Sequence, residues 1–247
     1  MAVYLITGAS SGIGLELSKQ AVAAGHTVYG AARRNDVLEK LRNDLGPSFI
    51  PVILDVTDRE AVRAACASLP ALPDVVILNA GVGENESRKK FDASVHERTF
   101  GVNYFGAIYV IDALLPSFIE RGSGKFVAIS SLAAYRGLPL GGAYGASKAA
   151  LSIAIESMRV TYGWTGVRFV TVHPGFVDTP IQKGGRPPFM MPVSKAAKKI
   201  LSGIDRDCLD ITFPLIIHLS MIVLIHTPNW LYARIMGKNS PMKHGEG

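Results

Sequence analysis

The sequence predicts an α/β protein, a doubly wound parallel sheet with helices on both faces, from two patterns that alternate along the chain. Short apolar runs of strand length occur at 3–7, 27–32, 49–54, 74–78, 125–130, 167–172 and 211–214. Between them, the apolar spacing of helices occurs at 12–24, 36–45, 58–69, 93–120, 143–162 and 194–203. Strands that are apolar throughout, such as 75–78, suit a sheet covered on both faces. Since crossovers between parallel strands are right-handed, we expect about seven strands in a single α/β domain.

Length and cysteine content fit this class. A chain of 247 residues can bury a substantial core without metal or disulfide support. The two cysteines, Cys66 and Cys208, have no histidine partners at metal-ligand spacing, so neither a disulfide nor a metal site is expected. The first strand starts within three residues of the N-terminus and leaves no room for a signal peptide. We therefore expect a cytoplasmic protein.

The net charge of +6 comes from the C-terminal quarter. Lys and Arg number 17 against 16 Asp and Glu over residues 1–181, but 9 against 4 over residues 182–247. A basic tail suits an anionic membrane surface or an anionic carrier, although solvated lysines around a substrate lid are the commoner explanation. The sequence has no interleaving of basic and aromatic residues and no helix-turn-helix pattern, so no nucleic-acid partner is expected.

A glycine-rich turn follows the first predicted strand. It reads Thr7-Gly8-Ala9-Ser10-Ser11-Gly12-Ile13-Gly14 and leads into a helical pattern. Glycines allow a tight turn and close approach of a pyrophosphate, whose charge the helix N-terminus stabilises. A loop that merely needs flexible residues is the alternative, but the strand before it and the helix after it favour a dinucleotide site. The expected contacts are Gly8, Ser10, Ser11, Gly12, Ile13 and Gly14.

A second pattern points to redox chemistry. Tyr144 and Lys148 lie four residues apart on a predicted helix, and Ser131 precedes the tyrosine by thirteen positions. Residues four apart share a helix face, so the ammonium can favour the phenolate. Lowering a phenol pKa from about 10 to about 7 takes on the order of 4 kcal/mol. A Tyr-x-x-x-Lys match alone is weak, because an exposed lysine beside a packed tyrosine gives the same spacing.

Further motifs give the chain a resemblance to the short-chain dehydrogenase/reductase family over roughly residues 3–180. They are Asp55-Val56, Asn79-Ala80-Gly81, Gly101-Val102-Asn103, Ile129-Ser130-Ser131 and Pro174-Gly175-Phe176-Val177-Asp178-Thr179. The resemblance implies a Rossmann-like fold, NAD(P)-dependent oxidoreductase activity and a homodimer or homotetramer. It further implies that Tyr144 protonates a carbonyl oxygen, Ser131 holds the same oxygen, and Lys148 lowers the tyrosine pKa and binds the nicotinamide ribose. Asn103 would stabilise this geometry and a water beside Lys148.

The resemblance also implies a set of cofactor contacts. Besides the glycine turn they are Asp55, Val56, Asn79, Ala80, Gly81, Tyr144, Lys148, Pro174, Gly175, Val177 and Thr179. Ser130 is the rival to Ser131 and is disfavoured, because the family's interval to the tyrosine points to Ser131.

The end of the second predicted strand favours NADP(H). Ala32 stands where NAD-using relatives carry an aspartate, and Arg33 follows it with a fork of donors suited to a 2′-phosphate. The alternative is that Arg33 or Arg34 is a solvated loop residue. Asp36 could bind a ribose if the loop folds differently, so NAD(H) remains the less favoured alternative.

Residues 181–247 are expected to form a substrate lid and an apolar C-terminal segment of the same domain as the core, 1–180. The stretch 180–192 ends in Phe189-Met190-Met191, which suits either a lid with apolar anchors or ordinary core. Residues 211–233 have no charged side chain, but Pro214 and Pro228 divide them. A helix of about thirteen residues covers roughly 20 Å, short of a hydrocarbon core of about 30 Å. An interfacial segment, a subunit contact or a pocket wall fits better.

The sequence thus predicts an NADP(H)-dependent oxidoreductase that interconverts an apolar ketone or aldehyde and its alcohol. A reductase of carrier-bound 3-oxoacyl groups is one alternative, and a non-catalytic NADP-sensing interaction protein is another. Peripheral membrane association is expected to involve Trp230, Tyr232, Arg234 and Lys238.

Overall fold

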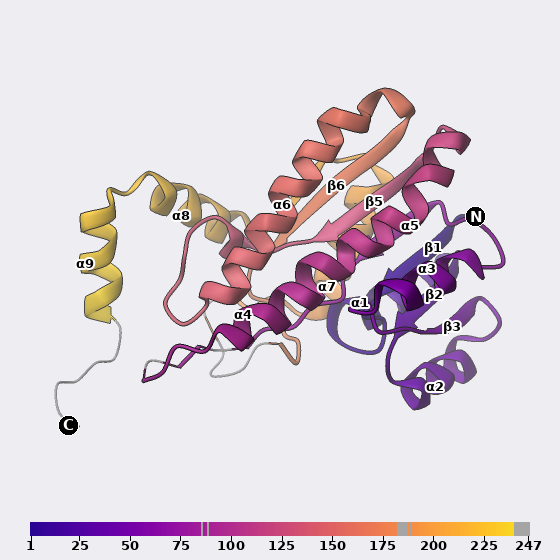
Figure 1. The fold of residues 1–247 in the computed structure, drawn as a ribbon, viewed down its shortest axis with the longest axis horizontal. Helices are drawn as coiled ribbons and strands as arrows, with labels where there is room; N and C mark the ends of the chain where they lie inside the picture. Colours follow the sequence, from indigo (N-terminus) through magenta and orange to yellow (C-terminus); the bar gives the residue numbers. More distant parts are fainter. Residues whose placement is uncertain (85, 88, 182–186, 188, 240–247) are drawn as a thin grey trace.

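Seven parallel strands form one sheet in the computed structural model, which describes residues 1–84, 86, 87, 89–181, 187 and 189–239. The strands are β1 (Val3–Thr7), β2 (Thr27–Ala32), β3 (Phe49–Ile53), β4 (Val75–Leu78), β5 (Gly124–Ile129), β6 (Val167–Pro174) and β7 (Asp210–Phe213). Their order across the sheet is β3-β2-β1-β4-β5-β6-β7 (Figure 1). The order reverses between β1 and β4, so the predicted doubly wound sheet is confirmed.

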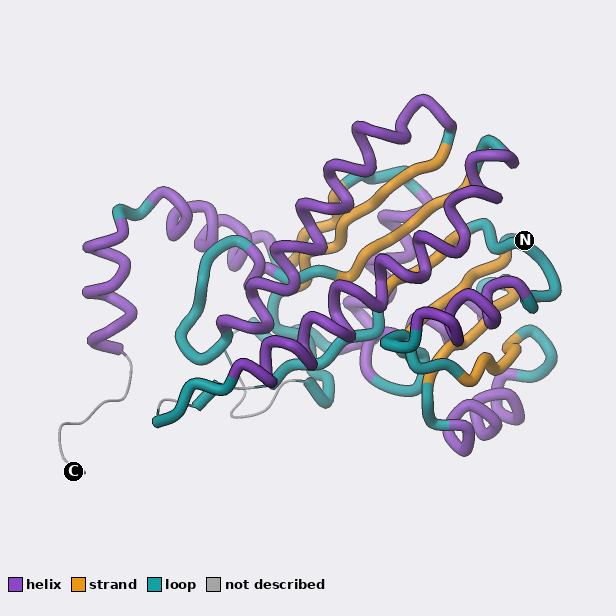
Figure 2. Tube along the Cα trace, viewed as in Figure 1, coloured by secondary structure: helices purple, strands orange, loops and turns teal. Residues whose placement is uncertain are grey.

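Helices cover both faces of the sheet (Figures 1 and 2). They are α1 (Gly12–Ala23), α2 (Asn35–Leu45), α3 (Arg59–Ala67), α4 (Ala93–Phe100), α5 (Gly106–Arg121), α6 (Gly142–Tyr162), α7 (Val193–Asp205), α8 (Leu215–His226) and α9 (Asn229–Asn239). On one face α1 packs against α7, and on the other α3 packs against α5. The last strand and α7 complete the sheet and this helix layer, so both belong to the same core as the N-terminal strands.

The two faces bury alternate residues of the same strands. Tyr4 and Ile6 of β1 join a core cluster with Leu17 and Ile200, whereas Leu5 joins a second cluster with Leu114. Successive side chains of a strand point to opposite faces, so a strand between two helix layers must be apolar at every position. This requirement explains the continuous apolar runs in the sequence.

The predicted helix at 93–120 has an interruption. Between α4 and α5, residues Gly101–Phe105 form a π-helical turn, η1, in which Asn103 is buried. At the start of α5 a Cβ on Gly106 would lie only 2.7 Å from Cγ2 of Val56, so glycine permits this close approach. Such turns insert an extra residue and frequently mark functional sites.

By length and composition alone, one helix among the described residues could cross a membrane, and it is this continuous run, Ala93–Arg121. Its residues Val110, Leu114 and Phe118 are buried in the core cluster beneath the sheet. Packing against the sheet therefore accounts for the apolar residues on its inner face.

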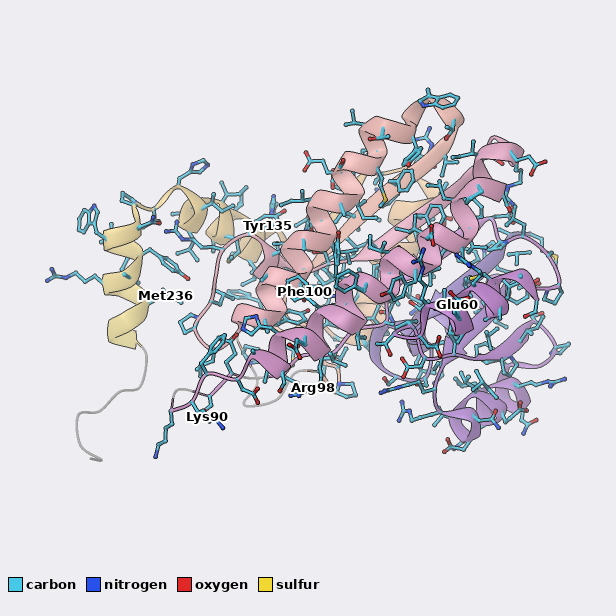
Figure 3. The ribbon with its side chains drawn as sticks, in the orientation of Figure 1. Glu60, Lys90, Arg98, Phe100, Tyr135 and Met236 are labelled. Carbon is cyan, nitrogen blue, oxygen red and sulfur yellow. The ribbon has the colours of Figure 1, made fainter. Side chains whose placement is uncertain are left out.

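The charge-free stretch 211–233 forms the end of β7, all of α8 and the first part of α9. The twelve-residue α8 lies between Pro214 and Thr227, as the two prolines suggested, whereas α9 was not predicted. Both helices reach away from the body of the protein in Figure 1, and Met236, labelled in Figure 3, lies on α9.

Candidate active site

An open cleft of about 900 Å³ lies at the carboxyl ends of the strands. This edge is where ligands gather in open α/β sheets. The predicted residues that line it are Gly8, Ser10, Ser11, Gly12, Ile13, Arg33, Asp55, Val56, Asn79, Ala80, Gly81, Ser131, Tyr144, Lys148, Pro174, Gly175, Val177 and Thr179. Gly14 and Asn103 were also predicted, and both support the cleft from behind its lining.

The glycine turn forms a narrow cradle between β1 and α1. Gly8 and Gly12 have φ angles of +70° and +55°, which disfavour other residues. Gly14 has no such angle, but a Cβ there would lie 2.4 Å from the Gly8 carbonyl oxygen. The side chain of Ser11, the N-cap of α1, makes no capping hydrogen bond to the helix. The first amides of α1 are therefore directed to a ligand site that suits a pyrophosphate.

Thr7 and Asn79 hold the ends of β1 and β4 together. The amides of Asn79 and Ala80 each donate to Oγ1 of Thr7 at 3.0 Å, and Nδ2 of Asn79 donates to the Thr7 carbonyl at 2.8 Å. These bonds fix the floor of the cleft where the strand order reverses.

Two arginines stand at the rim of the cleft and have different partners. Arg33 has an exposed side chain and lies 3.6 Å from the Asp55 carboxylate. Arg34 donates to the carbonyl of Ser10 at 2.8 Å and to its hydroxyl at 3.0 Å, so it braces the glycine turn. Burial raises the pKa of Asp55, but hydrogen bonds from Thr57 and the charge of Arg33 outweigh it and hold that pKa below its ordinary value. The bracing by Arg34 was not predicted.

Ser131 and Tyr144 face each other across the middle of the cleft. Ser131 follows β5 and caps the short 3-10 turn η2 (Leu132–Ala134), where its hydroxyl accepts a hydrogen bond from the amide of Ala133. Tyr144 lies in the first turn of α6, and its phenol interacts with the side chain of Ser131. Burial raises the pKa of the Tyr144 phenol above its ordinary value of 10, and the interaction with Ser131 offsets only part of this rise.

That Lys148 lowers the pKa of Tyr144 stays a prediction, because burial dominates the pKa of the phenol in this structure. The Lys148 ammonium is buried and donates to the Ile129 carbonyl at 2.7 Å, while it lies 5.9 Å from the centre of the Tyr144 ring. Burial also lowers the pKa of Lys148 to about 8. The dry surroundings that destabilise the ammonium destabilise the phenolate as well.

Asn103 bonds to the loop after β4 and to α6. Its side-chain oxygen accepts from the Val82 amide at 2.8 Å, and its nitrogen donates to the Val82 carbonyl and to Oγ of Ser147, both at 3.0 Å. Ser147 directly precedes Lys148, so the π-helical turn holds in place the helix that carries the lysine.

Ser130, the rival serine, has a different environment. Its hydroxyl donates to the carbonyl of Lys148 at 3.0 Å and lies 2.7 Å from Oγ of Ser152. These bonds fasten β5 to α6. Of the two neighbouring serines, Ser131 is therefore the one that interacts with Tyr144.

Comparison with known proteins identifies the family. A family model described as short chain dehydrogenase matches residues 2–188. The chain belongs to that family. An uncharacterized oxidoreductase of Myxococcus xanthus is 38% identical over 219 residues, which cover 85% of this chain and 86% of the relative. An NADP-dependent 3-hydroxy acid dehydrogenase of Salmonella typhi is 34% identical over 179 residues, covering 71% and 72%.

A solved structure agrees with the fold. The short chain dehydrogenase from Burkholderia cenocepacia, in complex with NADP, has a TM-score of 0.84 at 26% identity, covering 95% of this chain and 97% of that one. The structural similarity extends beyond the region matched by the family model, to include α7 and β7.

Within this short-chain dehydrogenase, a residue missed by sequence reasoning fixes the start of α6. The N-cap of that helix is Gly141, which has no side chain to cap it. The carboxylate of Glu86 instead accepts from the Ala143 amide at 2.8 Å, and the Glu86 amide donates to the Leu140 carbonyl. A carboxylate at a helix N-terminus is favourable, and here it sits one residue before Tyr144.

The far end of the cleft is apolar. Its lining includes Leu138, Pro139, Leu140, Phe176, Ile181, Ile217 and Met221, none of which was predicted as a site residue. Ile217 and Met221 lie four residues apart within the charge-free segment, a spacing that places them on one face of a helix. The sequence does not show which face of this helix turns toward the cleft. Of the expected lid, residues 182–186 and 188 lie outside the described residues, and Met191 packs against the core.

Proposed function

We propose that this protein is an NADPH-dependent reductase of apolar ketones or aldehydes, with alcohol oxidation as the reverse reaction. The observation that carries the proposal is that Ser131 and Tyr144 interact and line one cleft, which joins a glycine cradle to an apolar end. The phosphate-binding features and the proton donor thus face the same space.

The cleft suits NADPH, which supplies a hydride to the substrate carbon when it is bound. The cradle of Gly8, Gly12 and Gly14 would bind the pyrophosphate, and Arg33 at the rim would donate hydrogen bonds to the 2′-phosphate. Asp36 does not line the cleft among the described residues, which removes the main support for NAD. The NADP complex of the Burkholderia relative supports the same choice.

Tyr144 would donate the proton to the carbonyl oxygen. Its raised pKa keeps the phenol protonated across neutral pH, which suits reduction, whereas oxidation requires the phenolate. Ser131 would hold the same oxygen and align it with the donor. Lys148 would bind ribose hydroxyls, and Asn103 would keep α6 in register through Ser147.

The apolar end of the cleft supports an uncharged substrate. Among the described residues that line the whole cleft, the cationic side chains are Arg33, Arg34 and Lys148. Arg33 lies beside Asp55, Arg34 donates to the glycine turn, and Lys148 donates to the Ile129 carbonyl. A substrate carboxylate, as in a hydroxy acid, would lack a cationic partner at the apolar end within the described part of the chain, so medium-length ketones and aldehydes fit better.

Replacing the proton donor tests the mechanism. We expect Tyr144→Phe to lower kcat for ketone reduction by about 100-fold or more, because general acid catalysis is lost, while the Kd for NADPH changes less than about twofold. NADPH absorbance with a panel of aliphatic ketones, aldehydes and 3-oxoacyl thioesters measures turnover. Tyr162→Phe, at the other end of α6, is the matched control and should keep full activity. Undiminished turnover by Tyr144→Phe would rule out this residue as the acid.

Replacing each of the two rim arginines should affect the binding of NADPH and NADH differently. Because a charge-assisted phosphate contact is lost, Arg33→Ala should raise the KM for NADPH by about tenfold or more and leave the KM for NADH nearly unchanged. Arg34→Ala removes the brace on Ser10, so it should weaken both cofactors to a similar extent. Steady-state kinetics with each cofactor measure both effects. Equal changes for NADPH and NADH in Arg33→Ala would contradict the phosphate contact.

We also propose that the outer face of α8 and α9 binds an anionic lipid surface. Its exposed apolar side chains are Leu215, Ile216, Leu219, Ile222, Val223, Ile225, Trp230 and Ile235. No acidic residue occurs between 211 and 239, and Arg234 is exposed on α9. Tyr232 was predicted to contact lipid, but its hydroxyl instead donates to the Gly137 carbonyl. The side chain of Lys238 lies outside the described residues.

Sedimentation with vesicles of phosphatidylcholine and phosphatidylserine tests this proposal. We expect the wild type to bind, and binding to fall at least about tenfold when two charges are placed on the face by Leu219→Glu with Val223→Glu. Val160→Glu, at an exposed apolar position of α6, is the control and should bind like the wild type. If the wild type does not bind vesicles with or without phosphatidylserine, the lipid assignment is contradicted. A self-association that the double variant abolishes would also contradict it.

A further inference from the structure

The loop between β5 and α6 carries an arginine that the proposed chemistry does not use. Nη1 of Arg136 donates to the carbonyls of Leu224, Ile225 and Thr227, the last two at 2.9 and 2.8 Å. Nη2 donates to the side-chain oxygen of Asn229 at 2.9 Å. One guanidinium thus serves the last carbonyls of α8 and the link to α9.

Tyr232 of α9 and Gly137 of the loop strengthen this attachment. The Arg136 guanidinium lies 4.1 Å from the centre of the Tyr232 ring, and the Tyr232 hydroxyl donates to the carbonyl of Gly137. The last carbonyls of a helix have no partners within the helix, and a cation there is favourable. Only arginine combines several in-plane donors with a flat face that stacks on an aromatic ring.

The other fastenings of α8 are near its start. β7 leads directly into the helix, and the Gly175 amide donates to the Phe213 carbonyl at 2.7 Å. Tyr135, labelled in Figure 3, lies between the body and α8, with its ring 5.6 Å from that of His218. Met221, near the middle of the helix, is the one buried side chain of α8 among the described residues. The last turn of the helix therefore depends on Arg136 for its attachment.

The helix held in this way is also a wall of the cleft. Ile217 and Met221 lie one turn apart on the same face of α8 and line the apolar end. Residues 138–141, which follow Arg136 in its loop, line the cleft as well and lead to Tyr144. Arg136 thus fixes the spacing between two apolar walls without reaching the cleft itself.

We propose that Arg136 is a positioning residue that clamps α8 against the 132–141 loop and thereby sets the preference for the chain length of the substrate. The inference rests on the proposed reductase function. It assigns the apolar end of the cleft to the alkyl chain of the substrate, with Ile217 and Met221 as the residues that contact it.

A series of 2-alkanones from butanone to decanone tests the specificity. Because the wall loosens, Arg136→Ala should raise the KM for 2-octanone by about tenfold and reduce the preference for long over short ketones, with kcat and the KM for NADPH within about twofold of wild type. Arg136→Lys keeps the charge without the fork, so it should be intermediate. Arg59→Ala is the matched control, since Arg59 pairs with Asp112 and lies over the Tyr109 ring but does not line the cleft.

Hydrogen exchange measures the clamp without any activity. Amides of residues 215–226 should exchange about tenfold faster in Arg136→Ala than in wild type, and those of β1 and β4 should not change. Tyr232→Phe removes only one hydroxyl, so it should also speed exchange of the 215–226 amides, but by less than Arg136→Ala.

Unchanged exchange in α8 overturns the clamp, whether or not a ketone is reduced. Parallel losses of kcat and NADPH binding in Arg136→Ala would also overturn it, because they indicate collapse of the whole site. If exchange in Arg136→Ala rises as expected but the wild type reduces no ketone, the reductase proposal fails, and the specificity role fails with it.

Discussion

Burial of the Lys148 ammonium is the constraint that shapes the centre of the cleft. An ammonium out of water is costly unless hydrogen bonds replace its hydration, and the Ile129 carbonyl at 2.7 Å provides one such bond. A Cβ on Gly81 would lie 3.4 Å from Nζ, so the Asn79-Ala80-Gly81 motif leaves room for the charge. The ends of β4 and β5 and the start of α6 therefore have to meet around one side chain.

The same packing gives the neighbouring groups their properties. Ser130 fastens α6 to β5, and the neighbouring Ser131 interacts with Tyr144. Because burial disfavours the phenolate, the phenol holds its proton, which favours donation to a carbonyl over abstraction from an alcohol. Polar chemistry is thus confined to the middle of the cleft, between a cradle for phosphates and an apolar end closed by α8.

The sheet, the glycine turn and the positions of Ser131, Tyr144 and Lys148 could be predicted, because they depend on periodicity and short-range spacing. The π-helical turn at Asn103 could not, because the apolar spacing runs on through it and its contacts are with residues distant in the sequence, such as Val82 and Ser147. The direction of the Tyr144 pKa shift depends on burial and on where Lys148 points, and neither is encoded in a four-residue interval. Arg136 meets Leu224 across 88 positions, so no local pattern reports the clamp or the inward face of α8.

The free energy of unfolding as a function of pH, for the wild type and Lys148→Met, tests the buried charge most directly. The lysine has a pKa of about 8 in the folded chain and an ordinary value of 10.5 when unfolded. Between these values the unfolded state binds more protons, so wild-type stability relative to the variant should rise by about 3 kcal/mol from pH 8 to 10.5. A difference that stays constant, or falls, over this range would show that the ammonium is not buried as described.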